Sequence, residues 1–224
     1  MKFEGTKVFG LENTLVGMRL PMNKNYEEAQ SKCDSVIEHN VDHEFDNNVK
    51  VGEKDLDLMK RLIKADVSGG VGQPNSKFLR MIHVQVAITG PLYWWKEADT
   101  YKVGTTANSS STMHRITNYP ITQECFELPI FDETLEKLES LRVQYNETKD
   151  KDVWKQLIVN LPESWLQTRM WDADYATLRN IYKWRKNHKL TEWHSFCDWI
   201  ETLPYAKELI TDENKILKGE LNDI

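Results

Sequence analysis

Cysteine and long apolar runs are scarce in this sequence of 224 residues, and the 29 basic residues are outnumbered by 35 acidic ones. The three cysteines, Cys33, Cys125 and Cys197, are far apart, odd in number and without CxxC spacing. This pattern predicts neither a disulfide framework nor a zinc knuckle, and it is typical of proteins from reducing compartments. The histidine-containing run HKLTEWH lacks HExxH spacing, so we expect no metal site.

The charge balance excludes one large class of partner. The formal net charge is -6, whereas proteins that bind the nucleic-acid backbone usually carry a basic domain or stripe. A small anionic ligand is therefore favoured over a nucleic acid. No stretch is long and apolar enough for a membrane span, and the N-terminus has no secretory apolar region. We expect a cytoplasmic protein without membrane contact, and an apolar fraction of 40% predicts one compact domain over residues 1–224.

Hydrophobic periodicity predicts a chain of mixed strands and helices. Alternating Ile82, Val84, Val86 and Ile88 predict a half-buried strand within residues 78–92. One or two strands with a turn are expected at residues 10–21, and a polar loop at residues 39–57. Asp174 is a suitable N-cap for a helix that begins at Tyr175. Apolar residues at helical spacing predict helices within residues 25–39, 56–65, 91–102, 161–171, 175–185 and 191–203, and two more within 132–159.

The segment from Gly104 to Ser111 is rich in small polar residues and is closed by Met113-His114-Arg115. Hydroxyl, amide and open backbone groups are the donors that a phosphate or a ring carbonyl requires. We interpret the segment either as a loop that cradles a ligand or as a surface linker, since such residues are common in turns. Its side-chain donors are Thr105, Thr106, Asn108, Ser109, Ser110 and Ser111.

A second polar cluster lies downstream and includes Arg169, Arg179, Asn180, Arg185 and His188. On the predicted helix at residues 175–185, Arg185 is seven residues from Leu178 and four from Ile181, so it projects from the apolar side. A guanidinium in that position needs a partner. A carboxylate of Glu192 or Asp174 would form an ion pair with it, and a phosphate or pyrimidine carbonyl would make it a ligand contact.

The run LPESWLQTRMW at residues 161–171, followed by the helix at 174–185, resembles the C-terminal half of the flavin-dependent thymidylate synthases. That family has an LP…YTRFFW run before a helix of pattern NxR…N…LR. The expected strand at Val84 to Pro91, the tryptophan-rich helix after it and the segment with Asn108 and Ser111 fall where the family has its strand and its signature RHRxxSxNExSxRY. The resemblance covers residues 80–195, is weak over 1–79, and is followed by a charged tail at 205–224. It is closest in kind to divergent, phage-like members.

The resemblance implies an α+β fold with a central, mainly antiparallel sheet flanked by helices. It also implies site residues on the nucleotide side. Arg169 matches an arginine that contacts the substrate, Arg185 one that faces the pyrimidine, and Ser111 the serine of SxRY. Arg185 and Ser111 would be the catalytic residues. The substrate-binding residues that it implies are Arg169, Arg185, Ser109, Ser110, Ser111 and Arg115, the last replacing a lost arginine.

The flavin side of the signature is degenerate. The RHR triplet is replaced by Thr100-Tyr101-Lys102, and the NxR pair becomes Asp174 and Ala176. Each lost charge-assisted contact contributes about 1.5–3 kcal/mol, so much of the binding energy for the FAD pyrophosphate is missing. The cofactor-binding residues that the resemblance implies are Tyr101, Lys102, Thr105, Thr106, Asn108, Asn180 and His188.

Three hypotheses follow. The first is a thymidylate synthase-like enzyme that methylates C5 of a pyrimidine deoxynucleotide such as dUMP, with methylenetetrahydrofolate as one-carbon donor and reduced FAD as hydride source, in a homotetramer. The second is a nucleotide-binding protein that has lost the flavin and sequesters or senses a pyrimidine nucleotide. In the third, Arg169 and Arg185 have partners within the chain and bind no nucleotide.

Overall fold

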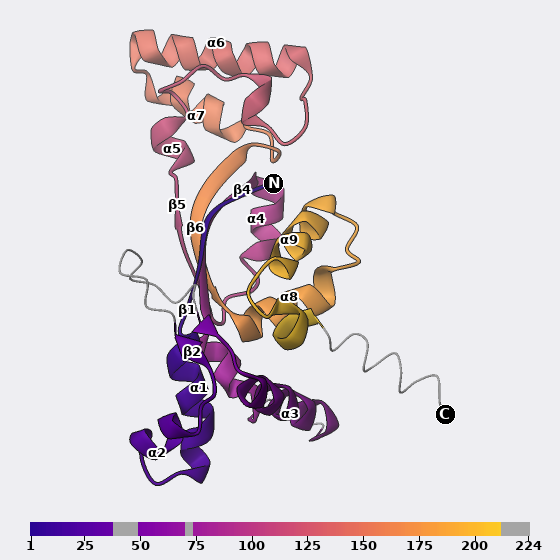
Figure 1. Cartoon of the computed structure of the whole chain (residues 1–224). Helices are drawn as coiled ribbons and strands as arrows, with labels where there is room; N and C mark the ends of the chain where they lie inside the picture. The colour runs from indigo at the N-terminus through magenta and orange to yellow at the C-terminus, as the bar shows by residue number, and fades with distance from the viewer. Residues whose placement is uncertain (38–48, 70–73, 212–224) are drawn as a thin grey trace, which may run out of the picture. The chain divides into compact units, whose positions relative to one another are not determined.

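The computed structural model describes residues 1–37, 49–69 and 74–211. Figure 1 colours the chain by residue number. The chain divides into two compact units. Unit 1 consists of Met1–Glu4, Ala87–Thr100 and Ala107–Trp171, and unit 2 consists of Gly5–Val86, Tyr101–Thr106 and Asp172–Ile224. The interpretation of residues 1–224 as one domain stays a prediction.

A four-stranded, mainly antiparallel sheet has the strand order β1-β4-β6-β5. Every one of these strands contributes residues to both units. The predicted strand within residues 78–92 is confirmed as β4, in which Val84, Val86 and Ile88 are fully buried. The strands are β1 (Lys2–Phe9), β4 (His83–Pro91), β5 (Thr105–Ser109) and β6 (Leu166–Asp174).

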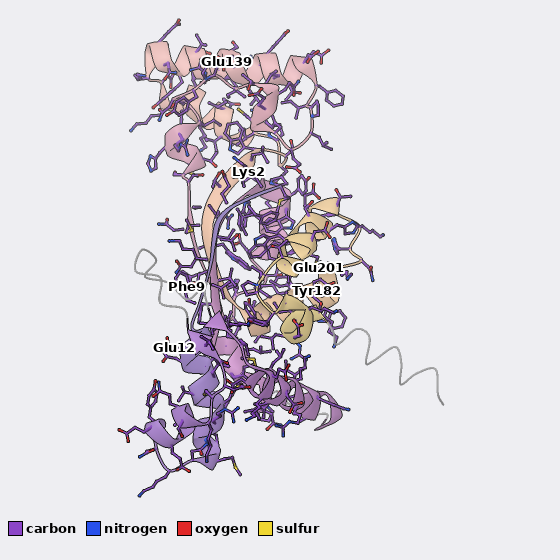
Figure 2. All side chains as sticks on the ribbon, in the orientation of Figure 1. Lys2, Phe9, Glu12, Glu139, Tyr182 and Glu201 are labelled. Carbon is purple, nitrogen blue, oxygen red and sulfur yellow. The ribbon has the colours of Figure 1, made fainter. Side chains whose placement is uncertain are left out.

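Unit 2 is mainly helical outside its strand segments. Its α8 begins where predicted, because the Asp174 carboxylate accepts the backbone N–H of Thr177 at 2.7 Å. Tyr182 of α8 donates its hydroxyl to Glu201 of α9 at 2.5 Å, and Figure 2 labels both residues. The elements are α1 (Leu11–Arg19), η1 (Leu20–Met22), α2 (Tyr26–Ser31), β2 (Val36–Ile37), β3 (Val49–Lys50), α3 (Glu53–Gly69), η2 (Ser76–Met81), α8 (Tyr175–Arg185), α9 (Thr191–Glu201) and η4 (Lys207–Thr211).

The prediction of strands at residues 10–21 is wrong, because this segment forms α1 and η1. Leu11, Leu15 and Val16 lie at helical spacing and are buried, so the segment gains more from a helix with one apolar face. Gly10 precedes α1 with φ 87°, and a Cβ there would lie 2.1 Å from the Met81 carbonyl oxygen. Only glycine allows this approach.

Other predictions in unit 2 fare better. The helix at 56–65 is confirmed within α3, and α9 confirms most of the helix at 191–203. The helix at 25–39 is confirmed only as the shorter α2, and positions 38 and 39 lie outside the described residues. The loop at 39–57 also falls partly outside them, and α3 begins within it at Glu53. Residues 212–224 of the charged tail are not described, and Leu209 and Ile210 before them are buried.

Unit 1 has an apolar core between its helices and the connecting segments. The predicted helix at 91–102 is confirmed as α4, and the two helices within 132–159 are confirmed as α6 and α7, which pack together. Lys149, with φ 55°, ends α6 in the left-handed conformation. The helices are α4 (Leu92–Ala98), α5 (Thr112–Arg115), η3 (Gln123–Cys125), α6 (Asp132–Thr148) and α7 (Lys151–Val159). The buried core residues are Ile116, Ile121, Phe126, Leu138, Leu141 and Leu157.

The predicted helix at residues 161–171 is wrong, because most of this segment forms β6. The backbone of Thr168 instead pairs with the neighbouring segment, where its carbonyl accepts the N–H of Ser110 at 2.9 Å. The indole N–H of Trp95 donates to the Gln167 carbonyl at 3.0 Å. These nonlocal hydrogen bonds satisfy the backbone as a strand.

Candidate functional site

The residues predicted for the site are divided between the two units. Unit 1 contains six of them: Asn108, Ser109, Ser110, Ser111, Arg115 and Arg169. Unit 2 contains seven: Tyr101, Lys102, Thr105, Thr106, Asn180, Arg185 and His188.

The segment expected to be a loop around the ligand is largely a strand. Thr105–Ser109 form β5 at the edge of the sheet, next to β6. Asn108 and Ser109 are exposed. A polar, exposed edge strand is a common way to avoid unwanted strand pairing, and threonine favours strands. The prediction of a loop is therefore wrong for these five residues, and only Ser110 and Ser111 lie between β5 and α5.

Ser111 has a defined local role as the N-cap of α5. Its hydroxyl oxygen accepts the backbone N–H of His114 at 3.3 Å. A serine hydroxyl has one proton to donate and two lone pairs, so this contact leaves the proton available. Arg115 ends the same short helix, and its side chain is exposed.

A pocket of about 220 Å³ lies within unit 1 and contains three of the predicted substrate-binding residues. These are Ser110, Ser111 and Arg115. Thr112 and Thr168 add two further hydroxyls, while the aromatic rings of Tyr119 and Trp165 add flat apolar surface. The remaining lining residues are Ile116, Pro120, Cys125 and Leu166.

Arg169 of β6 has partners within unit 1. Its Nη1 donates to Oδ1 of Asp99 at 2.7 Å, and its Nε donates to Oε1 of Gln167 at 2.9 Å. The guanidinium carbon lies 4.2 Å from the centre of the Trp95 ring, a cation–π distance. The Arg169 side chain is only 15% exposed. The structure thus provides an internal ion pair for this arginine, as the third hypothesis expects.

Arg185 in unit 2 lies among aromatic rings. Its Nε donates to the hydroxyl of Tyr101 at 2.8 Å, and its guanidinium carbon lies 5.5 Å from the Tyr101 ring and 4.9 Å from the Trp193 ring. His188 contacts the same Trp193 edge-to-face, with ring centres 6.4 Å apart. Sequence spacing correctly placed Arg185 toward the apolar side of α8, but it did not identify Tyr101 as a partner.

The other residues predicted to bind the cofactor are of two kinds. Lys102, Thr106 and Asn180 are exposed. Thr105 donates its hydroxyl to the Tyr101 carbonyl at 2.6 Å, and Nδ1 of His188 accepts the backbone N–H of Leu190 at 3.2 Å. The two half-buried residues therefore already use polar atoms inside the chain.

Two further residues of interest are buried. Burial lowers the pKa of Arg179 to about 10, while the nearby Asp66 carboxylate acts in the opposite direction. Burial raises the pKa of the Cys197 thiol to about 12, so this thiol is neutral near pH 7 and acts as an apolar packing group.

Within residues 1–37, 49–69 and 74–211, no cluster of three or more His, Cys, Asp or Glu residues could hold a metal ion. Over the same ranges, no helix has the length and apolar character that a membrane crossing requires.

Comparison with solved structures identifies the fold. ThyX from Helicobacter pylori, a flavin-dependent thymidylate synthase solved with FAD and dUMP, matches 95% of this chain and 99% of its own, with a TM-score of 0.65 at 16% identity. The chain has the fold of the flavin-dependent thymidylate synthases. A second H. pylori ThyX structure, also with FAD and dUMP, matches 95% of this chain and 98% of its own with a TM-score of 0.62 at 16% identity.

The ThyX fold extends to a related methylase. The UMP/dUMP methylase PolB from Streptomyces cacaoi, bound with 5-Br dUMP, matches 94% of this chain and 95% of its own, with a TM-score of 0.54 at 11% identity. Neither a scan against protein-family models nor a search of curated protein sequences returns a match. The predicted α+β class, with its mainly antiparallel sheet flanked by helices, is confirmed, and so is the resemblance at the level of the ThyX fold.

Proposed function

We propose that this protein binds a pyrimidine nucleoside monophosphate in the pocket of unit 1. The observation that carries the proposal is the composition of the pocket wall, in which Arg115 and four hydroxyl side chains meet two aromatic rings. A guanidinium and hydroxyls are suitable donors for a phosphate, and an aromatic ring offers a stacking surface for a base. The H. pylori and S. cacaoi structures of this fold, whose ligands are dUMP and 5-Br dUMP, support the pyrimidine class.

The size of the pocket indicates how much of the ligand it encloses. Pockets for drug-sized ligands usually have about 300–1,000 Å³, so 220 Å³ suits the phosphate and part of the nucleoside. Ser111 would donate its remaining hydroxyl proton to a ligand oxygen while its lone pair caps α5. The exposed Arg115 would supply the positive charge. The predicted roles of Ser109 in substrate binding and of Arg185 at the pyrimidine stay predictions.

For the reaction at this site, we propose C5 methylation of the pyrimidine, on the strength of the fold match to ThyX and PolB. FAD would supply the hydride in such a reaction, and methylenetetrahydrofolate the carbon. The predicted FAD residues do not fit that cofactor well, however. Lys102 is the one cation among the seven, and Tyr101, Thr105 and His188 already use polar atoms within the chain.

A pyrophosphate with two negative charges needs more cationic or backbone donors than this set offers. The poor fit favours, as a second candidate function, a nucleotide-binding protein without turnover.

The first experiment is the visible absorption spectrum of the purified protein after incubation with FAD and washing, with and without dUMP. A retained flavin band supports the methylation proposal, which a turnover assay with methylenetetrahydrofolate then tests directly. An unfolding temperature raised by dUMP, without a flavin band, supports the nucleotide-binding protein. If the protein retains no flavin band and dUMP does not raise its unfolding temperature, both candidate functions are contradicted. Light scattering of the same sample tests the predicted homotetramer.

A pair of variants on α5 tests the pocket itself. Arg115→Ala is expected to weaken dUMP binding roughly 10- to 150-fold, the range for a charge-assisted hydrogen bond of about 1.5–3 kcal/mol. Because Arg115 is exposed, the unfolding temperature without ligand should not change. His114→Ala on the same helix is the control and should bind dUMP as the unmodified protein does. Equal affinity of the two variants would place the nucleotide elsewhere.

A further inference from the structure

Arg169 is held on the side of β6 that faces Trp95, where Asp99 and Gln167 are its polar partners. Asp99 Oδ1 and Gln167 Oε1 accept from Nη1 and Nε at 2.7 and 2.9 Å. The ring of Trp95 covers the guanidinium, at 4.2 Å from ring centre to carbon. The pocket is instead lined by Leu166 and Thr168 of β6 and by Trp165 just before this strand.

Gln167 connects Arg169 to the pocket wall. While its Oε1 accepts from Arg169, its Nε2 donates to the carbonyl of Ser110 at 3.0 Å and lies 3.4 Å from the hydroxyl of Thr112. Arginine can only donate and a carbonyl can only accept, so both ends of the amide have a single allowed orientation. Ser110 and Thr112 both line the pocket.

We propose that Arg169 and Gln167 are positioning residues, which hold the 110–112 segment of the pocket in place through the series Asp99, Arg169, Gln167. Arg169 then acts on the nucleotide through Gln167 and does not contact it. This inference rests on the proposed function of the pocket, and it revises the role expected for Arg169 from the sequence.

The geometry explains why such a support is needed at this point. Between β5 and α5 the chain has only Ser110 and Ser111, and the backbone of Ser110 is tied to β6 by the hydrogen bond to Thr168. A glutamine side chain is flexible, and it positions a partner only when both of its ends are anchored. Asp99 and Trp95 supply the anchor at the Arg169 end.

The substitution Asp99→Asn separates this proposal from direct contact between Arg169 and the nucleotide. If Arg169 binds the phosphate, Asp99 competes for the guanidinium, and its neutralisation raises dUMP affinity. If Arg169 is a positioning residue, the same change loosens its anchor and lowers dUMP affinity. Glu163→Gln is the matched control, because it also removes one negative charge from unit 1, from an exposed pair with Lys96, without touching Arg169.

The test has two measurements. The first is hydrogen exchange of the Ser110 amide in the protein without ligand, where Asp99→Asn and Gln167→Met should each exchange roughly fivefold faster than Glu163→Gln, about the effect of one net hydrogen bond. Gln167→Glu keeps the acceptor for Arg169 but cannot donate to the Ser110 carbonyl, so it should resemble Gln167→Met. The second measurement is dUMP affinity, which should fall roughly fivefold in Asp99→Asn relative to Glu163→Gln.

The outcomes separate this inference from the proposed function. Unchanged Ser110 exchange in Asp99→Asn and Gln167→Met would overturn the positioning role, whatever dUMP does. Higher dUMP affinity in Asp99→Asn than in Glu163→Gln would also overturn it, in favour of direct contact. If exchange is faster in the variants but the protein does not bind dUMP, Arg169 and Gln167 still position the 110–112 segment, and the proposed nucleotide binding is rejected.

Discussion

The hydroxyl of Tyr101 accepts the Nε–H of Arg185 at 2.8 Å. This hydrogen bond connects the last residue of α8 to Tyr101, 84 residues earlier in the chain. Trp193 covers the same guanidinium at 4.9 Å from its ring centre. These contacts show why an arginine on the apolar side of a helix is tolerated. The rings of Tyr101 and Trp193 and the phenol oxygen of Tyr101 surround the guanidinium of Arg185. All three residues belong to unit 2.

Tyr101→Phe removes the hydrogen bond but keeps the ring against Arg185. We expect the free energy of unfolding to fall by about 1 kcal/mol, the net value of such a bond at a partly buried site. Urea denaturation measures it. Tyr26→Phe, at an exposed position on α2, is the control and should change the unfolding free energy by less than about 0.5 kcal/mol. Equal effects of the two variants would show that the Tyr101 bond contributes nothing.

The buried carboxylate of Asp55 connects α3 to α1 and to the segment before β2. Its Oδ1 accepts Nε and Nη2 of Arg19 at 2.9 and 2.5 Å. Its Oδ2 accepts the hydroxyl of Ser35 at 2.6 Å and the backbone N–H groups of Asp34 and Ser35 at 3.0 and 3.1 Å. Asp55→Asn places an amide N–H₂ opposite these donors, so we expect a loss of about 3–5 kcal/mol in unfolding free energy.

A second aspartate on α3 provides the control for this measurement. Asp57 pairs with Arg61 at 2.8 Å, but both side chains are about two-thirds exposed, at 65% and 67%. Exposed ion pairs contribute only about 0–1 kcal/mol, so Asp57→Asn should leave the urea midpoint nearly unchanged. If Asp55→Asn were equally mild, the buried pair would have no structural importance.

Glu139 on α6, labelled in Figure 2, forms an ion pair with Arg142 of the same helix. Its hydrogen bonds with Arg142, at 2.5 and 2.8 Å, lower its pKa from the ordinary 4.5, and burial acts in the opposite direction. A lowered pKa stabilises the folded state above the ordinary value, and this stabilisation is lost as the pH falls through the folded pKa.

Stability measured by urea denaturation should therefore decline as the pH falls below about 4.5, and it should decline less steeply in Glu139→Gln. Glu136→Gln, at an exposed position on the same helix, should keep the steep decline of the unmodified protein. If the unfolding free energies of the two variants fell equally steeply at acid pH, the prediction would be contradicted.

Gly104 should be among the least replaceable residues of unit 2. Its φ is 72°, and an added Cβ would lie 2.3 Å from Oδ2 of Asp174 and 2.7 Å from the Thr177 hydroxyl. Gly104→Ala should therefore cost about 1–2 kcal/mol in backbone strain and about 1 kcal/mol more through the disturbed cap of α8. Gly5→Ala, with φ 62° and nothing within 4 Å of the new Cβ, isolates the strain alone. Thermal unfolding of both should show the larger loss for Gly104→Ala.

Local chemistry made some elements predictable from the sequence. The N-cap at Asp174 requires only residues 174–177, and the alternation in β4 needs only its own residues. The strand β6 was missed because Leu161-Pro162 resembles a helix start, whereas its strand conformation depends on pairing with a segment near Ser110. The helical spacing of Leu11, Leu15 and Val16 was available in the sequence, but Gly10 and Gly17 obscured it.

The candidate site also combines residues that local sequence predicts with residues that only the fold brings together. Ser110, Ser111 and Arg115 lie in one short segment, and a sequence rich in hydroxyls identified them. Tyr119 and Trp165 join them in the pocket only through the fold, in which Phe126 and Trp165 form an isolated antiparallel bridge. The partner of Arg169 could not be predicted either, because Asp99 is 70 residues away in the chain.

The division of every strand of the sheet between the two units has a consequence for how the protein can be dissected. Each unit is assembled from three separate stretches of chain, and the boundaries at residues 4, 86, 106 and 171 fall inside strands. No single proteolytic cut can release either unit intact, and neither can be expressed as one continuous fragment. During synthesis, unit 1 lacks its part of β6 until residue 171 has been made, and unit 2 lacks its part until residue 174. The two units therefore complete their parts of the sheet at almost the same time.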